Sequence, residues 1–123
     1  MISVVIPTLN EAEALPLLLA DLARESGLAE IIVVDGGSCD GTQDIARQAG
    51  ARLVEAPAGR GTQLHAGAST ARGAIILFLH ADSRFPAGGA ARIAEELAAQ
   101  RRAPGGNFRL VFDGGDSFCT WLT

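Results

Sequence analysis

Four short runs rich in aliphatic residues are spaced along the chain. They cover residues 2–6, 30–34, 52–55 and 74–79, and the first, second and fourth consist mainly of Ile, Val and Leu. Near-continuous apolar runs of this length are typical of strands that are buried on both faces of a sheet. The pattern therefore predicts four strands, the third of them short.

The segments between these runs are predicted to be helical. Leu15, Leu18, Leu19 and Leu22 recur at the spacing of one helix face, and Gly27 follows them as a stop signal. The predicted helices cover about 12–25, 42–48, 62–72 and 89–101, and residues 57–61 are predicted to form a loop.

A further strand is predicted at residues 107–112, where Phe108, Leu110 and Phe112 fall on the same side. This alternation is typical of a strand with one exposed face. Strands that alternate with helices favour a parallel sheet with right-handed crossovers and helices on both faces. The whole pattern therefore predicts an α/β fold.

Composition narrows the possible functions. The chain has 123 residues, of which 48% are hydrophobic, and this supports one domain with a core but not two. The formal net charge is −4, and all ten basic residues are Arg with no basic stripe among them. A protein that binds nucleic acid through its backbone is therefore not expected.

The sequence also bears on where the protein acts. Its apolar runs, such as 74–79, are much shorter than the roughly 20 residues of a membrane-spanning helix. The N-terminus enters a strand without the basic region of a signal peptide. Cys39 and Cys119 are too few for a disulfide framework, so reduced thiols are expected. These features predict a cytoplasmic protein without a transmembrane segment, at most peripheral to the inner face of the membrane.

Several common catalytic and nucleotide-binding motifs are missing from the sequence. No G-x-G-x-x-G follows the first predicted strand, and the absence of Lys means that no P-loop can be completed. There is no G-x-S-x-G turn and no cluster with zinc-ligand spacing. Classical dinucleotide binding, P-loop chemistry and serine hydrolysis are therefore disfavoured.

Polar residues follow three of the predicted strands. They are 8–11 (Thr-Leu-Asn-Glu), 35–38 (Asp-Gly-Gly-Ser) and 80–83 (His-Ala-Asp-Ser). Ligands of open parallel sheets bind beyond the carboxyl ends of the strands. Acidic groups that gather there are costly unless they bind a cation or accept hydrogen bonds. We therefore expect a ligand site at this edge of the sheet.

The densest of these segments is 35–42, Asp-Gly-Gly-Ser-Cys-Asp-Gly-Thr. Its glycines permit a sharp turn and the close approach of a ligand. Asp40 or Ser38 can cap the next helix, whose N-terminus favours an anion, and Asp35 can accept a hydrogen bond from a base N–H. A plain strand–turn–helix connection with a cap is the structural alternative.

His80 and Asp82 lie two residues apart on an extended segment, so their side chains share a face. Asp82 could hold Mg²⁺ that also contacts phosphates, and the imidazole could join it in a Mn²⁺ site. Arg60, between two glycines of the predicted loop, could close over a phosphate. The structural alternatives are a hydrogen-bonded histidine, a turn acid and a solvated arginine.

Taken together, three segments resemble glycosyltransferase family 2, whose members have the GT-A fold. SVVIPTLNEA (3–12) is similar to that family's opening strand and P-x-x-N-E turn, and IIVVDGGSCDGT (31–42) to its V-D-[DG]-x-S-x-D-G-T segment. GRGTQLHAGASTARGAIILFLHADS (59–83) resembles the third block, which ends at the D-x-D-type metal motif. The L-H-A-D sequence at residues 79–82 is most similar to the bacterial subgroup called transferase 2, rSAM/selenodomain-associated.

The resemblance implies a Rossmann-like GT-A fold and inverting transfer of a sugar from a UDP- or GDP-sugar. Asp35 would then accept from uracil N3–H if the donor is a UDP-sugar, and Arg60 would lie near the diphosphate. Asp82, with His80 as a candidate second ligand, would hold Mn²⁺ or Mg²⁺ that stabilises the leaving group. The residues that would bind the nucleotide are Pro7, Thr8, Asn10, Glu11, Asp35, Gly36 and Arg60.

The chain departs from the family pattern at two points. The first Asp of the D-x-D motif is His80 here, so a metal would rest on Asp82 alone or recruit the imidazole. The acidic pair that supplies the base of inverting members does not occur before Thr123, and Asp113 and Asp116 lie in a Gly-rich turn. Residues 1–123 are therefore expected to be a C-terminally truncated donor domain without its acceptor segment.

Two other functions stay open on the sequence. A non-catalytic nucleotide-binding or interaction module left by truncation would bind nucleotide without turnover. A nucleotidyltransferase would need a Gly-rich basic loop after the first strand, but PTLNEAEALP (7–16) contains no glycine. A truncated sheet would also leave 107–112 as an open edge with Phe108 and Phe112 uncovered, which predicts a homodimer or aggregation.

Overall fold

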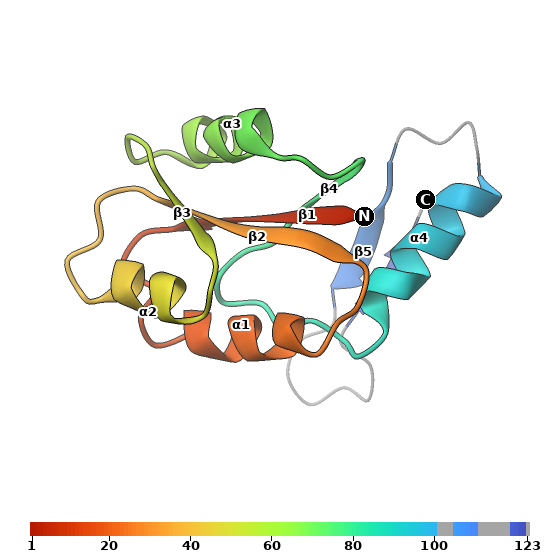
Figure 1. Cartoon of the computed structure of the whole chain (residues 1–123). Coiled ribbons are helices and arrows are strands. Elements are labelled where there is room, and N and C mark those ends of the chain that lie inside the picture. Colours follow the sequence, from red (N-terminus) through yellow and green to blue (C-terminus); the bar gives the residue numbers. More distant parts are fainter. Residues whose placement is uncertain (101–104, 111–118, 123) are drawn as a thin grey trace.

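A computed structural model describes residues 1–100, 105–110 and 119–122. Its central sheet is parallel, with the strand order β3-β2-β1-β4. Helix α3 covers one face of this sheet, and α1 and α2 cover the other (Figure 1). The predicted α/β fold with both faces covered is thus confirmed. The elements are β1 (Ile2–Thr8), α1 (Leu15–Ala23), β2 (Leu28–Asp35), α2 (Thr42–Gln48), β3 (Arg52–Glu55), α3 (Arg60–Thr70) and β4 (Ile75–Phe78).

The two faces of the sheet belong to separate apolar cores. Ile6 and Val33 point to the side of α1 and α2, where they pack with the buried leucines of α1. Val5 and Val34 point to the other side and pack against residues of α3. Successive residues of a strand face opposite sides, so a continuous aliphatic run serves both cores. This explains why the strands read as unbroken apolar runs.

Helix α3 approaches the sheet closely at Gly67, which is buried. A Cβ atom placed on Gly67 would lie 2.9 Å from Val34 Cγ2 and closer still to Val5 Cγ1. Protein interiors are close-packed, so neither valine can retreat without disturbing its neighbours. The missing side chain of Gly67 therefore sets the distance between α3 and the sheet.

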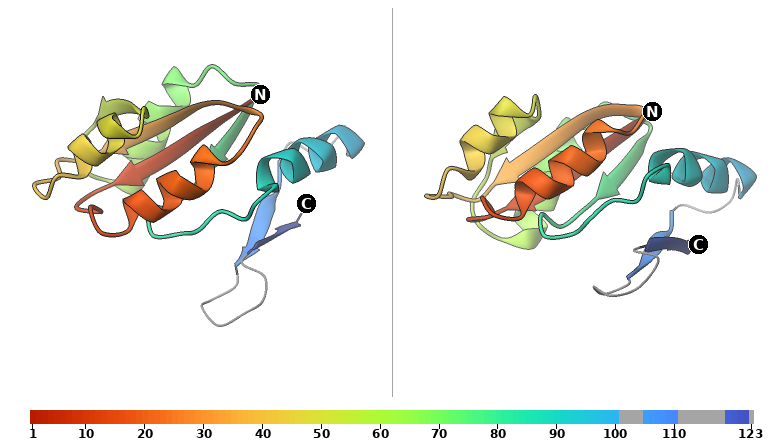
Figure 2. Two further views of the ribbon diagram at one scale, coloured as in Figure 1. Left: turned by 60° about the horizontal axis from the view of Figure 1, so that its bottom comes forward. Right: turned by 90° about the horizontal axis from the view of Figure 1, so that it is seen from below.

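After β4 the chain leaves the parallel sheet. Helix α4 (Gly89–Ala99) follows, and β5 (Asn107–Leu110) pairs with β6 (Cys119–Leu122) in a separate antiparallel sheet. Figure 2 shows this pair near α4 and apart from the parallel sheet. The expectation that 107–112 is an open edge of the parallel sheet is therefore wrong. Residues 111 and 112 lie outside the described residues, as do Asp113 and Asp116. In the described part of the chain, β3 and β4 are the edge strands of the parallel sheet.

Strand β1 runs through Pro7 to Thr8, although the sequence indicated that it ends at Ile6. Val5 carbonyl accepts from Leu79 on the β4 side, and Thr8 carbonyl accepts from Gly36 on the β2 side. Backbone groups alternate between the two sides, so the missing N–H of Pro7 faces the β4 side. The pairing of β1 with β4 ends at Val5, before Pro7. The proline therefore interrupts no hydrogen bond between the two strands.

Two helices begin at other residues than predicted. Helix α1 begins at Leu15 and not at Ala12, since residues 12–14 form a turn, in which Ala12 N–H donates to Asp40. Helix α3 begins at Arg60, inside the predicted loop, because Gln63 N–H and side chain both bond to Gly59. Strand β6 was not predicted, since a four-residue run carries little periodic signal.

We expect Gly67→Ala to lower the free energy of unfolding by about 1–3 kcal/mol, because the added methyl group overpacks the contact between α3 and the sheet. Gly61→Ala is the matched control in the same helix, since a Cβ there meets no atom within 4 Å. The control is expected to be neutral or slightly stabilising. Urea denaturation measures both variants, and equal stabilities would contradict the close approach.

Candidate functional site

The carboxyl ends of β1, β2 and β4 meet at one edge of the sheet. Strand β1 pairs in parallel with both neighbours, with Thr8 in register with Asp35 and Val5 with Phe78. The three polar segments singled out in the sequence therefore follow neighbouring strands at the same edge, as the fold pattern predicted. Such an edge is the usual ligand-binding position of an open α/β sheet.

Asn10 fastens the loop after β1 to the loop after β2. Its backbone N–H donates to Ser38 Oγ, and its side-chain oxygen accepts from Cys39 N–H, both at 2.8 Å. Asn10 has a φ of 54°, a left-handed conformation that Asn adopts more readily than most residues. The Asn of the P-x-x-N-E turn thus has a structural task.

Asp40 and Thr42 add a second fastening between the same two loops. Asp40 accepts from Ala12 N–H at 3.1 Å, and buried Thr42 accepts from Glu11 N–H at 3.0 Å. Asp40 also accepts from the Thr42 hydroxyl and N–H. The hydrogen bond from Thr42 is the main cause that keeps the pKa of Asp40 below its usual value. The two loops consequently form one unit.

Asp35 is fully buried, and its carboxylate accepts five hydrogen bonds. Oδ1 accepts from the hydroxyls of Thr8 and Ser38. Oδ2 accepts from Gly37 N–H, Ser38 N–H and the Gln43 amide, at 3.1, 2.8 and 2.9 Å. A carboxylate offers about four lone-pair sites, so these donors saturate it. Asp35 therefore organises the turn after β2, and the expected hydrogen bond to uracil N3–H is not favoured by this arrangement.

The same contacts determine the ionisation of Asp35. Burial is the largest single influence and raises its pKa. The hydrogen bonds from Gln43, Ser38 and Thr8 together outweigh burial and lower the pKa from 3.8 to about 2. Asp35 is consequently an anion near neutral pH, although it is buried.

Gln63 was missed by the sequence analysis, yet it joins α3 to the ends of two strands. Its side-chain nitrogen donates to the carbonyls of Thr8 and Val34, both at 2.9 Å, and its oxygen accepts from Gly59 N–H at 3.1 Å. A Cβ on Gly36 would lie 3.2 Å from the Gln63 amide. The only signal in the sequence was a lone amide among small residues, which says nothing about burial.

Arg60 lies in the first turn of α3 and reaches the end of β4. Its Nη2 atom lies 2.8 Å from Nε2 and 3.1 Å from Nδ1 of His80. Both side chains are exposed. Together they border a hollow of about 190 Å³, lined by Pro7, Arg60, Leu64, Phe78, Leu79 and His80. The structure thus brings together a guanidinium and an imidazole that are 20 residues apart in the chain.

Asp82 is exposed and has no hydrogen-bond partner among the residues that the structure describes. Within that part of the chain, no group of three or more His, Cys, Asp or Glu is arranged to hold a metal ion. Mg²⁺ is commonly held by one or two carboxylates together with substrate phosphates. Asp82 fits this mode, whereas the ring nitrogens of His80 are already contacted by Arg60.

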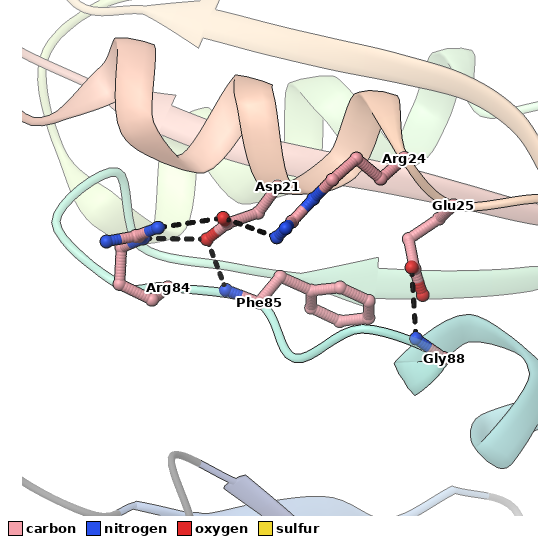
Figure 3. A network of polar contacts seen from close by, with 6 residues as sticks. All are labelled: Asp21, Arg24, Glu25, Arg84, Phe85 and Gly88. Carbon is pink, nitrogen blue, oxygen red and sulfur yellow. Dashed lines mark hydrogen bonds and ion pairs between the residues drawn. The ribbon is translucent and has the colours of Figure 1, made fainter.

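The segment that follows Asp82 is anchored to α1, as Figure 3 shows. Asp21 is 3% exposed and accepts two hydrogen bonds from Arg84 and one from Phe85 N–H, at 2.7 to 2.9 Å. The hydrogen bond from Arg84 is the largest cause that lowers the pKa of Asp21. Glu25 binds the backbone just before α4. These contacts hold both the chain after Asp82 and the start of α4 against α1.

A second hollow, of about 360 Å³, opens beside the saturated carboxylate of Asp35. Its walls come from the end of β2, the start of α2 and the end of β3. The lining residues are Asp35, Gly36, Gly37, Gln43, Glu55, Ala56 and Pro57. Glu55 was not singled out in the sequence, because an acid at the end of a short strand is common on protein surfaces.

A parallel sheet with helices on both faces, and with two hollows and an exposed carboxylate at its carboxyl edge, defines a Rossmann-like fold with a candidate ligand site. Comparison with known proteins identifies the protein family. The chain belongs to glycosyltransferase family 2, since the model of that family, described as glycosyl transferase family 2, matches residues 3–118. The rSAM-associated subgroup stays a prediction.

Curated relatives carry the same family identity. A PGL/p-HBAD biosynthesis glycosyltransferase of Mycobacterium bovis is 41% identical over 103 residues, which cover 76% of this chain and 40% of the relative. Glycosyltransferase AglJ of Haloferax volcanii is 32% identical over 98 residues, which cover 78% of this chain and 32% of the relative. The chain thus spans 40% or less of the length of these relatives.

Solved structures confirm the GT-A fold. The mannosyltransferase PcManGT from Pyrobaculum calidifontis, in complex with GDP-Man and Mn²⁺, has a TM-score of 0.71 at 30% identity, with 79% of this chain and 32% of that chain covered. Glucosyl-3-phosphoglycerate synthase from Mycobacterium tuberculosis, with Mn²⁺, UDP-glucose and glycerol 3-phosphate, has a TM-score of 0.62 at 28% identity, with 68% and 35% covered. No described helix of this chain is long and apolar enough to cross a membrane.

Asp35→Asn is expected to lower the free energy of unfolding by at least about 2 kcal/mol at pH 7. A pKa of about 2 in the folded chain, against 3.8 when unfolded, corresponds to this amount at about 1.4 kcal/mol for each pKa unit. Because the folded value is the lower one, the stabilisation is complete above about pH 4 and disappears as the pH falls towards 2.

Urea denaturation of both proteins at several pH values measures this difference. Asp44→Asn is the control, since that carboxylate is 75% exposed and pairs only at the surface with Arg47. It is expected to change stability by less than about 0.5 kcal/mol. A stability gap between Asp35→Asn and the parent chain that stays constant from pH 7 to 2.5 would contradict the assignment.

Proposed function

We propose that this chain is the donor-binding part of a glycosyltransferase, which transfers a sugar from a nucleoside diphosphate sugar to an acceptor. The observation that carries the proposal is the convergence of the Asp35 turn, Arg60 and Asp82 at one sheet edge in a member of glycosyltransferase family 2. Relatives that hold GDP-Man or UDP-glucose together with Mn²⁺ support it.

The nucleoside would rest on the two fastened loops. Asp35 and Thr8 contribute by shaping the turn, since their polar groups bond to each other at 2.8 Å. Gly36 and Pro7 present little side chain to a ligand. The carboxylate of Glu11 is half-buried and has no hydrogen-bond partner among the described residues, so it is suited to accept from ribose hydroxyls.

The diphosphate would lie between Arg60 and Asp82. Arg60 would turn from His80 to the phosphate oxygens, which its planar guanidinium can bind with two parallel hydrogen bonds. Asp82 would hold Mn²⁺ or Mg²⁺, which neutralises the charge that grows on the leaving diphosphate. The anchor from Asp21 to Arg84 keeps the chain after Asp82 in place while the ligand binds.

In the proposed reaction, the acceptor oxygen forms a bond to the sugar C1 atom while the bond from C1 to the diphosphate oxygen breaks, with inversion at C1. The acceptor proton passes to a general base. We assign no base among the described residues. The expectation that this base lies on a segment after Thr123, and the expectation of a cytoplasmic location, stay predictions.

A non-catalytic nucleotide-binding module is the second candidate. Such a module would bind nucleotide but would neither transfer nor hydrolyse the sugar. Addition of the C-terminal segment of a full-length relative would restore transfer if the chain is a donor domain, and would change nothing if it is a binding module.

Calorimetric titration with UDP- and GDP-sugars, with and without Mn²⁺, tests the donor site. We expect binding that Mn²⁺ strengthens, and Asp82→Asn is expected to weaken the Mn²⁺-dependent binding about tenfold or more, because it removes the carboxylate charge from the metal site. Asp44→Asn, on α2, is the control with unchanged binding. A folded chain that binds none of these donors would refute the proposal.

Self-association through an exposed strand edge is a further proposal. The edge strands of the parallel sheet are β3 and β4, and we place the contact at β4, where Ile76 and Phe78 are 39% and 48% exposed. Open apolar edges favour pairing with another chain. Light scattering is expected to show dimers or larger species, and Ile76→Thr is expected to shift them towards monomer. A monomer at high concentration of the unmodified chain would contradict this proposal.

A further inference from the structure

Two carboxylates line the hollow beside Asp35, that of Asp35 itself and that of Glu55. Only the second makes no hydrogen bond to another described residue. Asp35 is saturated by its five donors, and the Gln43 amide donates to Asp35 at 2.9 Å. Glu55, the last residue of β3, also lines the hollow. Its side chain is exposed and has neither a hydrogen bond nor an ion pair with any described residue. Its lone pairs are therefore available to a ligand.

The backbone holds Glu55 at a defined place beside the hollow. Glu55 is in register with Asp35, and the N–H of Ala56 donates to the carbonyl of Asp35 at 3.0 Å. Strand β3 thus remains paired with β2 up to the edge of the hollow. The carboxylate of Glu55 extends from a paired strand end, so only its own side-chain torsions have to adjust to a ligand.

The other walls of the hollow suit a flat aromatic ring. Gly36 and Gly37 contribute no side chain, so a ring can lie close to their backbone. A Cβ on Gly36 would lie 3.1 Å from Ala58 Cα, so a larger residue at this position would be crowded. Pro57, which is exposed, adds an apolar ring surface. The hollow therefore combines an apolar slot with a single uncommitted anion.

We propose that Glu55 reads the base of the donor nucleotide and selects guanine, which makes a GDP-sugar the donor. This inference rests on the proposed function. An ionised carboxylate only accepts hydrogen bonds. Guanine presents two adjacent donors, N1–H and the 2-amino group, and these match the two oxygens of a carboxylate in a bidentate pair.

The other common bases do not match this group. The N3–H of uracil is flanked by two carbonyl oxygens, so a carboxylate that accepts from N3–H meets at least one of them at close range. Adenine places the N1 acceptor next to its 6-amino group, which also opposes a carboxylate oxygen. Glu55 thus acts by repulsion of the wrong base as well as by attraction of guanine. Solved relatives hold GDP-Man in one case and UDP-glucose in another, so family membership alone leaves the base open.

Calorimetric titration of the chain with GDP, UDP and inosine diphosphate, each with Mn²⁺, tests the assignment. The unmodified chain is expected to bind GDP about tenfold or more tightly than UDP, as one bidentate contact to a base provides. Inosine diphosphate lacks the 2-amino group and is expected to bind more weakly than GDP. This comparison needs no variant.

Glu55→Gln provides the second test, because an amide can accept from uracil N3–H and donate to a neighbouring carbonyl. The variant is expected to lower the ratio of GDP affinity to UDP affinity about tenfold or more. The ratio cancels the general gain in affinity for anions that follows from removal of one negative charge. Glu95→Gln, an exposed acid on α4, is the matched control with an unchanged ratio.

The outcomes separate the two proposals. An unmodified chain that prefers UDP, or a Glu55→Gln variant with the parent ratio, would overturn the role of Glu55 and leave the proposed function standing. Equal binding of GDP and inosine diphosphate would likewise overturn the bidentate contact. A folded chain that binds no nucleoside diphosphate would overturn the proposed function itself, and the role of Glu55 with it.

Discussion

The buried carboxylate of Asp35 is the contact on which the site depends. It lies at the end of β2, where it accepts hydrogen bonds from Thr8 at the end of β1, from Gly37 and Ser38 in the turn after β2, and from Gln43 in α2. A buried anion is costly unless its hydrogen bonds are satisfied. The five hydrogen bonds offset the free-energy cost of burying the Asp35 carboxylate. They also hold the turn after β2 in one conformation. The hollow beside the turn depends on that conformation.

The motif residues and the uncommitted residues have different tasks at this edge. Asn10, Ser38 and Asp40 use their polar groups to join two loops, so little of that capacity is left for a ligand. Glu55 and Asp82 make no such contacts within the described part of the chain. A network in which every member is satisfied is rigid. The rigid network thus provides a support, and the exposed carboxylates around it are free to meet a ligand.

Much of the fold was predictable because its signals are local. The aliphatic runs of β1, β2 and β4 reflect strands that are buried on both faces, and the leucine spacing of α1 reflects a helix that is buried on one face. Both patterns can be recognised without knowledge of distant contacts. The first turn of α3 was placed in a loop, because its start depends on Gln63, which bonds to Gly59 and to strands far away in the sequence. Strand β6 was too short to leave a pattern.

By itself, the sequence determined the order of strands and helices up to β5, the family, and the fact that acids and amides follow strand ends. These properties depend on residue type and spacing alone. Only the tertiary structure decided which of those polar groups are already used. Asp35 looks like a ligand-binding acid in the sequence. Four of its five hydrogen bonds come from residues within eight positions of it, and the fifth comes from Thr8, 27 positions away, which reaches Asp35 only when β1 pairs with β2. For the same reason Glu55 is unremarkable in the sequence and becomes a candidate only beside a saturated neighbour.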